Sequence, residues 1–325
     1  MLNRRCFIAA AAPSLGLGLW QRGGQAHSYP SRPIKLVVAV TPGGAMDVMG
    51  RLIAQHLSER LGQVVVENRV GAGTTLGAKS VASAEPDGYT LLLANAATHC
   101  IGPLLYKSSA GYDPLTSFAP VAFLTSVPYV MVAATRPPVR TPQELVAYAK
   151  AAPAKLNFGV PNAAPAHLLA FWFRALTGTQ FGIVPYKGAA AVITDLLGGQ
   201  VQASFDVTSV ILSHLREGKI RALASATQSR LAELPELPTM TEAGFPDFVA
   251  SSWTAVVAPA GTPRDIVARL NAEINAGLVS APLQARFKQL AAEARPGTPE
   301  DLAAFIARDI PRWRTMAASA DIRGE

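Results

Sequence analysis

A short glycine-containing loop offers the clearest chemistry in this sequence. Thr41-Pro42-Gly43-Gly44-Ala45-Met46-Asp47 follows an apolar run and leads directly into a helical pattern. The first N–H groups of a helix lack intrahelical partners and lie at the positive end of its dipole, so they bind anions well. No lysine is present to pair with a triphosphate, so we predict a small carboxylate here. The alternative is an ordinary strand-to-helix turn in which Asp47 complements the dipole.

A second loop of the same kind lies in the middle of the chain. Residues 157–160 form an expected strand, and Pro161-Asn162-Ala163-Ala164-Pro165-Ala166-His167 leads from it into another helix. Ligands of parallel α/β sheets bind at the carboxyl ends of strands, so both loops should line one crevice. Thr98, just after the strand end at Asn95, and Asp206, at another strand end, would add polar groups there.

Two histidines raise the alternative of an enzyme on the same scaffold. His99 or His167 could act as a base, with Asp206 orienting it, although either can equally be a hydrogen-bonded structural histidine. The sequence contains no G-x-S-x-G motif and no cofactor fingerprint, and its five histidines include no H-x-x-x-H pair. We therefore predict a protein that is not an enzyme and that carries no metal and no cofactor.

The segment 67–80, ENRVGAGTTLGAKS, approaches two phosphate-loop patterns and fits neither. The third glycine of G-x-G-x-x-G comes one residue late, at Gly77, and Ala78 separates it from Lys79, where a P-loop needs adjacent Gly and Lys. Each such loop depends on which N–H groups converge on one oxygen, so a one-residue offset matters. We interpret the segment as a tight loop whose glycines serve backbone geometry.

The first 26 residues have the pattern of an export signal. Arg4 and Arg5 precede an apolar stretch from Ala9 to Trp20, and small residues at 24 and 26 suit a cleavage site before His27. The paired arginines also look like a twin-arginine signal. Either route would place the protein in the periplasm.

Composition indicates a globular protein without a nucleic-acid partner. The 325 residues are 50% hydrophobic and 16% charged, which excludes disorder and suffices for two packed domains. The formal net charge is +7, but lysines and arginines are scattered rather than clustered. Cys100 is the only cysteine after the signal, so no intramolecular disulfide can form, and we expect it to be a small buried residue.

Strands and helices alternate along the chain, which predicts an α/β fold with parallel sheets. The run 34–40 is continuously apolar, as in a strand buried on both faces, and helical spacing follows from 46 to 61. Thr141-Pro142-Gln143-Glu144 has the residue types of a capped helix start, as does Thr262-Pro263-Arg264-Asp265. Further expected strands lie at 64–66, 89–93, 156–160, 181–184, 201–205, 220–225 and 253–258, with helices at 76–84, 165–176, 189–197, 209–216, 262–279 and 299–316.

Two crossings divide the chain. Residues 117–134 are apolar enough to suggest a membrane span, but Pro120 and Pro128 interrupt them, so we expect two buried strands at a domain junction. The second crossing lies near 248–257, after the proline-rich connection 233–247. We predict a discontinuous first domain, residues 27–125 plus 250–325, and an inserted second domain, residues 126–249, that hinge against each other.

Several segments together resemble one protein family. TPGGAMD, ENRVGAGTTLGA, PDGYTLLL, YDPLTSFAPVA, DLLGGQVQASFD and LPELPTMTEAG look like the Bug receptors, the TctC-like substrate-binding proteins of tripartite tricarboxylate transporters. The resemblance implies a type II periplasmic binding protein with two doubly wound α/β domains around a ligand cleft. Such a protein closes on a small organic acid, here a mono- or dicarboxylate, and presents it to membrane permease subunits. We expect a monomer, and a ligand-sensing partner of a signalling protein is the alternative role.

The resemblance also implies which residues bind the ligand, because family members hold a carboxylate through backbone groups of two facing loops. One departure concerns the second loop, VPNAAPAHL, where family members commonly have a Ser/Gly-rich stretch. We therefore expect a ligand less polar than a tricarboxylate, such as an aromatic or short aliphatic monocarboxylate. The predicted site comprises Gly43, Gly44, Ala45, Asp47, Thr98, Asn162, Ala163, Ala164, His167 and Asp206.

Overall fold

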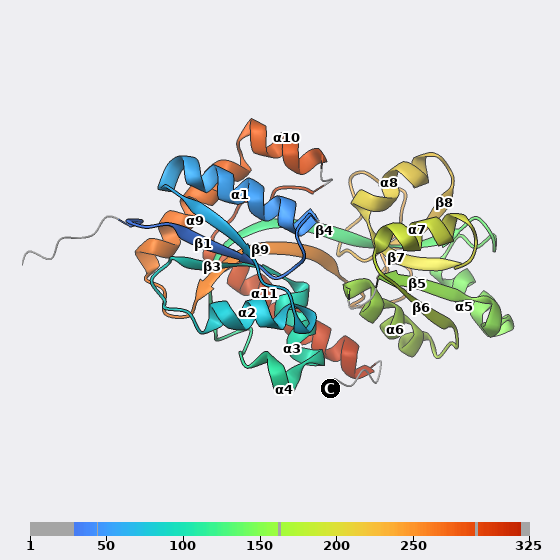
Figure 1. The fold of residues 1–325 in the computed structure, drawn as a ribbon. Helices are drawn as coiled ribbons and strands as arrows, with labels where there is room; N and C mark the ends of the chain where they lie inside the picture. Colours follow the sequence, from blue (N-terminus) through green and yellow to red (C-terminus); the bar gives the residue numbers. More distant parts are fainter. Residues whose placement is uncertain (1–28, 44, 162–163, 290–291, 320–325) are drawn as a thin grey trace, which may run out of the picture.

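The computed structural model describes residues 29–319, except 44, 162–163 and 290–291 (Figure 1). The predicted export signal and the start of the mature chain therefore lie outside the described residues. Within the described part, nine strands form a sheet in the order β2-β1-β3-β9-β4-β7-β5-β6, with β8 paired to β4. The strands are β1 Ile34–Val38, β2 Val64–Asn68, β3 Thr90–Asn95, β4 Phe118–Ala134, β5 Asn157–Pro161, β6 Gly182–Tyr186, β7 Ala203–Val207, β8 Ile220–Ser225 and β9 Ser251–Pro259.

Helices follow most strands, as the alternating pattern predicts. The longer ones are α1 Ala45–Leu61, α2 Thr75–Ala82, α5 Pro142–Ala151, α6 Pro165–Thr177, α7 Ala189–Leu197, α8 Thr208–Arg216, α9 Arg264–Leu278, α10 Ala281–Gln289 and α11 Pro299–Ser319. Shorter turns are the 3₁₀ segments Ala72–Thr74 and Pro153–Lys155, the π-helical turn Ala97–Ile101, α3 Gly102–Leu105 and α4 Lys107–Ala110. None of the helices in the described ranges is both long and apolar enough to cross a membrane.

One long strand, β4, joins two halves of the sheet. Its first part pairs antiparallel with β9, and its last part pairs with β7 on one side and β8 on the other. We call β2, β1, β3, β9 and the start of β4 the first sheet half, and β7, β5, β6, β8 and the end of β4 the second sheet half (Figure 1). The predicted domain boundaries fall within β4, at 125–126, and directly before β9, at 249–250.

The prediction of two strands in residues 117–134 was wrong, because β4 is a single strand of 17 residues. Its register against β9 shifts between Pro120 and Ala122 and again between Phe123 and Thr125. Such irregularities bend a strand without ending it. Among the named strands, only β9 pairs with this first part of β4, so Pro120 lies where a missing N–H is tolerated.

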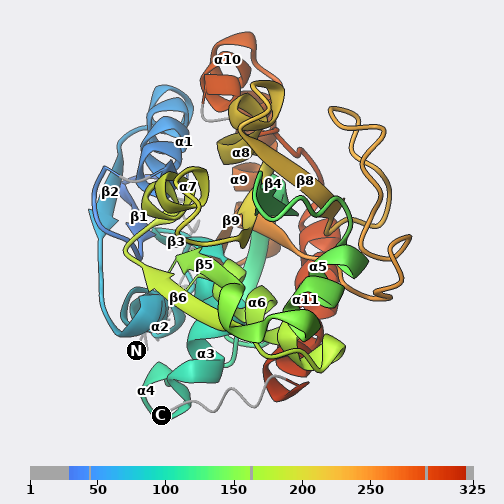
Figure 2. The same cartoon turned by 90° about the vertical axis from the view of Figure 1, so that its right-hand side faces the viewer.

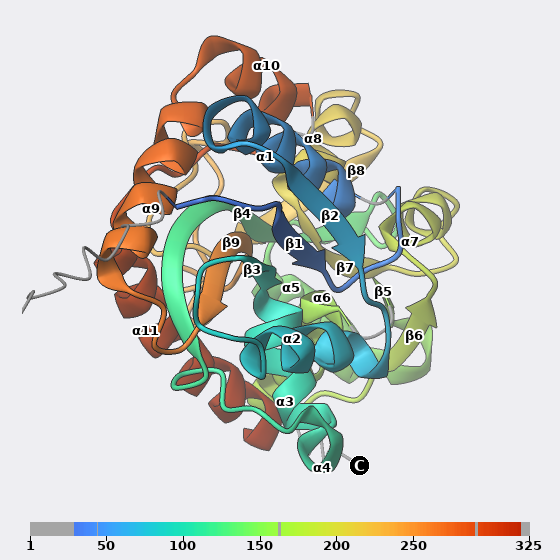
Figure 3. The same cartoon turned by 60° about the vertical axis from the view of Figure 1, so that its left-hand side comes forward.

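Apolar side chains cover both faces of the first sheet half. On β1, Leu36 and Val38 pack into a core beneath α1, whereas Val37 packs into the opposite core with Val81 of α2. Figure 3 shows α1 and α2 on opposite sides of β1 and β3. This two-sided burial explains why the strand is continuously apolar rather than alternating.

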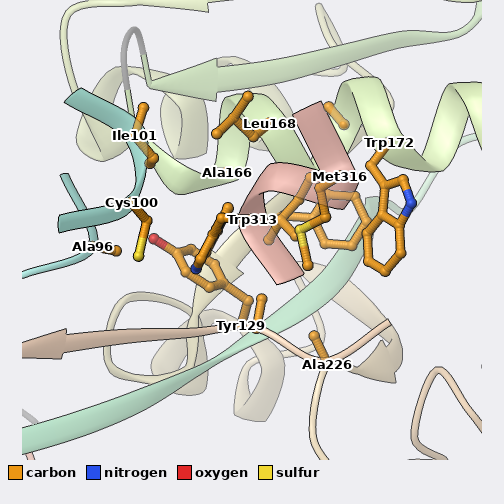
Figure 4. Close-up of a cluster of buried hydrophobic side chains, with 14 of the residues drawn as sticks. Ala96, Cys100, Ile101, Tyr129, Ala166, Leu168, Trp172, Ala226, Trp313 and Met316 are labelled. Carbon is orange, nitrogen blue, oxygen red and sulfur yellow. The ribbon is translucent and has the colours of Figure 1, made fainter. Parts of the chain in front are cut away.

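The helix α11 packs against β4 and covers the core that contains Val37. Figure 4 shows Trp313 of α11 beside Tyr129 of β4 and Cys100 of the π-helical turn. Cys100 is buried, as expected, and burial raises the pKa of its thiol. The irregular connection between β8 and β9 lies beside β8 in Figure 2, and its Met240 and Phe248 are buried in the same core.

The sequence pattern predicts the N-terminal cap of α5 correctly and that of α9 incorrectly. The Thr141 hydroxyl accepts a hydrogen bond from the Glu144 N–H at 3.1 Å, so α5 has the predicted cap. At α9 the cap position is Pro263, and the hydroxyl of Thr262 donates instead to the carbonyl of Pro259 at 2.7 Å. The helix α10 was not predicted at all, although Leu283 and Phe287 bury one of its faces.

Within the glycine-rich segment 67–80, only residues 69–74 form a tight turn, because β2 ends at Asn68 and α2 begins at Thr75. The last glycine, Gly77, lies in α2 and packs this helix against a strand end. A Cβ atom at Gly77 would lie 2.7 Å from the carbonyl oxygen of Arg69 and 2.8 Å from the Cβ of Ala39. The absence of a side chain therefore lets α2 approach β1 closely.

Candidate functional site

The first predicted loop is held by a buried carboxylate. Asp47 lies in the first turn of α1, and its Oδ2 accepts hydrogen bonds from the Gly43 N–H and from Nε of Arg51, both at 2.9 Å. Its Oδ1 accepts a hydrogen bond from Nδ2 of Asn68 at 2.8 Å. Asn68 Nδ2 also donates to the carbonyl of Val40 at 3.0 Å, so the two side chains fix both ends of the turn.

These hydrogen bonds keep Asp47 ionised. Burial by itself would raise the pKa of this carboxyl, but the hydrogen bonds from Arg51, Gly43 and Asn68 outweigh it and lower the pKa to about 2. Asp47 is therefore placed to position the loop, and the Gly43 N–H is already used. Gly44 lies outside the described residues, and of Ala45 the structure describes only that it begins α1.

The end of β3 forms a compact turn around Thr98. Its hydroxyl accepts a hydrogen bond from the Asn95 N–H and donates to the Asn95 carbonyl, each at 2.9 Å. Its own N–H donates to Oδ1 of Asn95 at 3.0 Å. Thr98 is fully buried, and its hydrogen bonds hold Asn95 in place. Asn95 itself is partly exposed. Asn95 Nδ2 reaches Sδ of Met46 at 3.1 Å, which joins this turn to the start of α1.

His99 is a buried structural histidine, which is one of the two roles that the sequence left open for it, and not an accessible base. It is fully buried, with ring centroids 4.9 Å from Phe118 and 5.8 Å from Trp253. Its Nδ1 lies 3.0 Å from the Thr98 hydroxyl, and its Nε2 has no hydrogen-bond partner among the described residues. Burial lowers its pKa to about 3, so the ring stays neutral. A base in this position would be out of reach of a dissolved substrate.

The second predicted loop leads into α6. Ala164 has an extended backbone at the cap position of that helix, and its carbonyl accepts the first hydrogen bond, from the His167 N–H at 3.0 Å. The His167 ring is half-buried and stacks on Phe171 with centroids 5.1 Å apart, and burial lowers its pKa. The predictions for Asn162 and Ala163 fall outside the described residues.

Asp206, like His99, has one buried polar atom without a hydrogen-bond partner among the described residues. It lies near the carboxyl end of β7 opposite Val130 of β4, and it is 3% exposed. Oδ1 accepts a hydrogen bond from the neighbouring Val207 N–H at 2.9 Å, but Oδ2 has no partner among the described residues. Burial, only partly opposed by that hydrogen bond, raises the pKa to about 7. Such a group either keeps its proton near neutral pH or needs a partner from outside the chain.

The sheet brings these residues together in two pairs. β1 and β3 are neighbouring parallel strands, so the loop at Gly43 and the turn at Asn95 share one edge of the first sheet half. β5 and β7 are neighbours in the second sheet half, which groups Pro161 with Asp206. In Figure 1 the start of α1 is the end of that helix nearest to β5 and β7. Asn95 and Asn68 were not in the predicted site, and only their positions at strand ends could have indicated them.

Two described cavities border β4 at Ser126 and Pro128, and one of them also reaches Thr208 and Ser209, directly after β7. None of the described residues of the predicted site lines either cavity. No group of three His, Cys, Asp or Glu side chains in the described ranges could hold a metal ion. In its described part the site offers the first turn of α1 with the Asn95 side-chain amide on one side, and the buried carboxyl of Asp206 on the other.

A mixed sheet in two halves, joined by crossing strands and with strand-to-helix loops at both inner edges, is the architecture of a periplasmic binding protein. The chain belongs to the tripartite tricarboxylate transporter family of receptors, whose family model matches residues 49–321. It is 40% identical over 291 residues to protein BugT of Bordetella pertussis, and the matched stretch covers 89% of this chain and 89% of BugT.

Solved structures show the same likeness. The R. palustris protein Rpa4515 with adipate has a TM-score of 0.75 at 36% identity, covering 91% of this chain and 100% of that one. MatC (Rpa3494) from Rhodopseudomonas palustris with bound malate has a TM-score of 0.73 at 33% identity, covering 89% and 99%. The recognition of the family and of the fold class from sequence segments is confirmed.

Proposed function

We propose that this chain is a periplasmic receptor that captures a small organic carboxylate and presents it to the membrane subunits of a tripartite transporter. The observation that carries the proposal is the placement of two strand-to-helix loops at the inner edges of two sheet halves joined by β4. Family membership supports the same role, and it argues against an enzyme.

The ligand we propose is a mono- or dicarboxylate with an apolar middle. Relatives at 36% and 33% identity were solved with adipate and with malate, which are both dicarboxylates. The loop around Ala164 offers few side-chain donors, which suits an aliphatic segment better than a third carboxylate. One carboxylate would lie at the first turn of α1 beside Asn95, and the other end of the ligand would lie near His167 and Asp206.

Asp206 would then act through its proton. An ionised Asp206 would repel a nearby carboxylate, whereas a protonated one can donate a hydrogen bond to it. Tyr129, whose pKa burial and the neighbouring Asp206 raise, is the titratable group on β4 that interacts with it. Tyr129 stays neutral at any working pH, so Asp206 sets the charge on this side of the site.

Capture would proceed by closure of the predicted domains, 27–125 plus 250–325 against 126–249. The ligand needs only to bind the closed arrangement more tightly than the open one. Export by the predicted signal and a monomeric state are parts of the same proposal.

A thermal-shift screen tests it. The mature chain, residues 27–325, is heated with mono-, di- and tricarboxylates, amino acids and nucleotides. A ligand at 100 times its Kd stabilises the protein by about 2.7 kcal/mol, which raises Tm by several degrees. Recovery of the ligand unchanged after incubation, measured by NMR, separates a receptor from an enzyme. No shift with any carboxylic acid, or a shift with nucleotides alone, would refute the proposal.

A further inference from the structure

A cavity of about 520 Å³ lies on the β4 crossing, and none of the predicted site residues lines it. Its walls come from five segments: β4 at Ser126 and Pro128, the start of the β8–β9 connection at 226–229, the stretch 249–251 at the start of β9, the stretch 293–295, and α11. We call it the crossing pocket. Its size is that of a small-molecule site.

Three arginines give this pocket a positive wall. Arg308 and Arg312 are one turn apart on α11, so they lie on one face of the helix, where like charges weaken the helix slightly. Arg295 lies beside them, with its guanidinium 4.6 Å from the Phe123 ring centroid and 5.8 Å from that of Phe305. Stacking uses the faces of a guanidinium and leaves its N–H edges free to bind oxygen.

The acidic groups nearby compensate this positive wall only in part, since Asp309 interacts electrostatically with Arg312 and Asp301 with Arg295. Among the described residues, no acidic side chain lies within 4.0 Å of Arg295, Arg308 or Arg312. Asp309 lines the pocket, but its Oδ2 accepts the indole N–H groups of Trp253 and Trp313 at 2.8 and 2.9 Å. Burial raises the pKa of Asp309, and the two indole N–H groups and the nearby Arg312 oppose this shift in part. Glu293 is the other acidic group in the lining.

The remaining wall is neutral and rich in hydrogen-bonding groups. Ser126, Thr227, Gln228, Ser229 and Ser251 contribute hydroxyl and amide groups. Thr227 is fixed by a hydrogen bond of 2.7 Å with the Ser225 hydroxyl at the end of β8. Guanidinium groups on one side and hydroxyls on the other suit a compact anion with many oxygens.

We propose that the crossing pocket binds a small free oxyanion carrying at least two negative charges, such as a phosphate or diphosphate. Arg295 belongs to the stretch that pairs with the start of β4. The helix α11, which carries the other two arginines, packs on β4 and on α6 of the second sheet half, whereas Thr227 and Gln228 come just after β8 of the second sheet half. An anion held by both walls therefore favours one relative arrangement of the two halves and couples to capture in the cleft. The coupling rests on the proposed function, whereas the binding does not.

Isothermal titration with inorganic pyrophosphate at fixed ionic strength tests the binding. We expect one saturable site per chain and at least tenfold weaker binding after Arg308→Ala with Arg312→Ala. Arg314→Ala is the control for charge on this helix, because it removes one arginine of α11 that does not line the pocket. Both altered arginines are at least partly exposed, so the variants should fold. Absence of saturable binding, or an equal loss in Arg314→Ala, would overturn the inference.

A second pair of variants separates this site from the proposed cleft. Gly44→Trp should abolish carboxylate binding and leave pyrophosphate binding intact if the two sites are distinct. Loss of pyrophosphate binding in Gly44→Trp, with retention in the double arginine variant, would place the anion in the cleft and overturn the inference. For coupling, saturating pyrophosphate should change the Kd of the identified carboxylate at least fivefold, and the reverse titration should show the same factor. Equal Kd values with and without pyrophosphate would refute the coupling.

Discussion

The backbone N–H of Gly43 donates a 2.9 Å hydrogen bond to Oδ2 of Asp47, so a side chain in the first turn of α1 holds the turn that precedes the helix. Sequence reasoning considered Asp47 as a ligand-binding residue or as a partner of the helix dipole. Its geometry adds a third role, because the same carboxylate also ties Arg51 and Asn68 to the loop. The shape of the predicted anion site therefore depends on a residue whose two carboxylate oxygens accept hydrogen bonds from Gly43, Arg51 and Asn68.

Replacing Asp47 by Ala should lower stability and weaken ligand binding together. The change leaves the Gly43 N–H without its acceptor and removes one of the two acceptors of the Asn68 amide. Losing hydrogen bonds to a charged group costs about 1.5–3 kcal/mol. Chemical denaturation and titration with the identified ligand measure the two effects. Glu59→Ala, an exposed change on the same helix, is the control and should leave both unchanged. Unaltered ligand affinity in Asp47→Ala would show that the loop keeps its shape without the carboxylate.

Asp47 should also contribute to acid denaturation. Its folded pKa, about 2, is lower than the ordinary 3.8, so its stabilisation is present above about pH 4 and is lost as the pH falls through 2. The shift corresponds to about 2 kcal/mol. Unfolding curves between pH 5 and pH 2 should therefore be less steep in pH for Asp47→Asn than for the parent. Parallel pH profiles would contradict this assignment.

Asp206→Asn should stabilise the free protein at alkaline pH and change little in acid. The folded pKa of Asp206 is about 7, above the ordinary 3.8, so ionisation opposes folding. Below about pH 4 both states are protonated and nothing is gained, whereas above pH 7 the full cost applies, up to about 4 kcal/mol. Tm measured at pH 4.5 and pH 8.5 tests the difference. A gain of the same size at both values would point to a cause other than charge.

Ligand affinity should depend on the same titration of Asp206. If Asp206 donates its proton to a bound carboxylate, the Kd of the parent rises as the pH passes from 6 to 8. The side-chain amide that the Asp206→Asn variant carries donates at every pH, so this variant should bind with a nearly constant Kd over this range. Glu217→Gln, a change on the solvent-exposed turn after α8, serves as the control. A parent Kd that does not change with pH would remove Asp206 from the contact.

Gly77→Ala should destabilise the protein by about 1–3 kcal/mol. The new methyl would overlap the Arg69 carbonyl, which is backbone and cannot rotate away. Gly198→Ala is the matched control, because its Cβ would meet nothing closer than 3.5 Å and its backbone is helical. Denaturation midpoints of the two variants should differ clearly, and equal midpoints would mean that α2 shifts without cost.

Sequence patterns predict the structure correctly where a single helix or strand determines it. The continuous apolar run around Leu36 and Val37 predicts burial on both faces, and both faces are packed. Thr141 and Glu144 predict a cap that depends only on neighbouring residues, and it forms. The same reasoning failed at Thr262, because its hydroxyl had a carbonyl of the preceding turn as a competing partner.

Patterns were insufficient where distant segments meet. Asn68 is 21 residues from Asp47, and nothing in the local sequence indicates that their side chains bond. Thr98 was chosen for its hydroxyl, but tertiary packing buries that hydroxyl and leaves Asn95 partly exposed. Pro120 and Pro128 suggested a break in residues 117–134, whereas register shifts against β9 keep β4 continuous. Which side chains are placed to contact a ligand therefore depends on tertiary packing and not on the local sequence.

The position of β9 between β3 and β4 has a consequence for how the chain matures. β9 is the last strand to be made, more than a hundred residues after β4. At 5–20 residues per second, synthesis leaves β3 and β4 without their shared neighbour for on the order of ten seconds. During that interval two strand edges, among them the apolar edge of β4, are open to pairing with other chains. A newly made chain therefore depends on protection from aggregation until its final quarter has emerged.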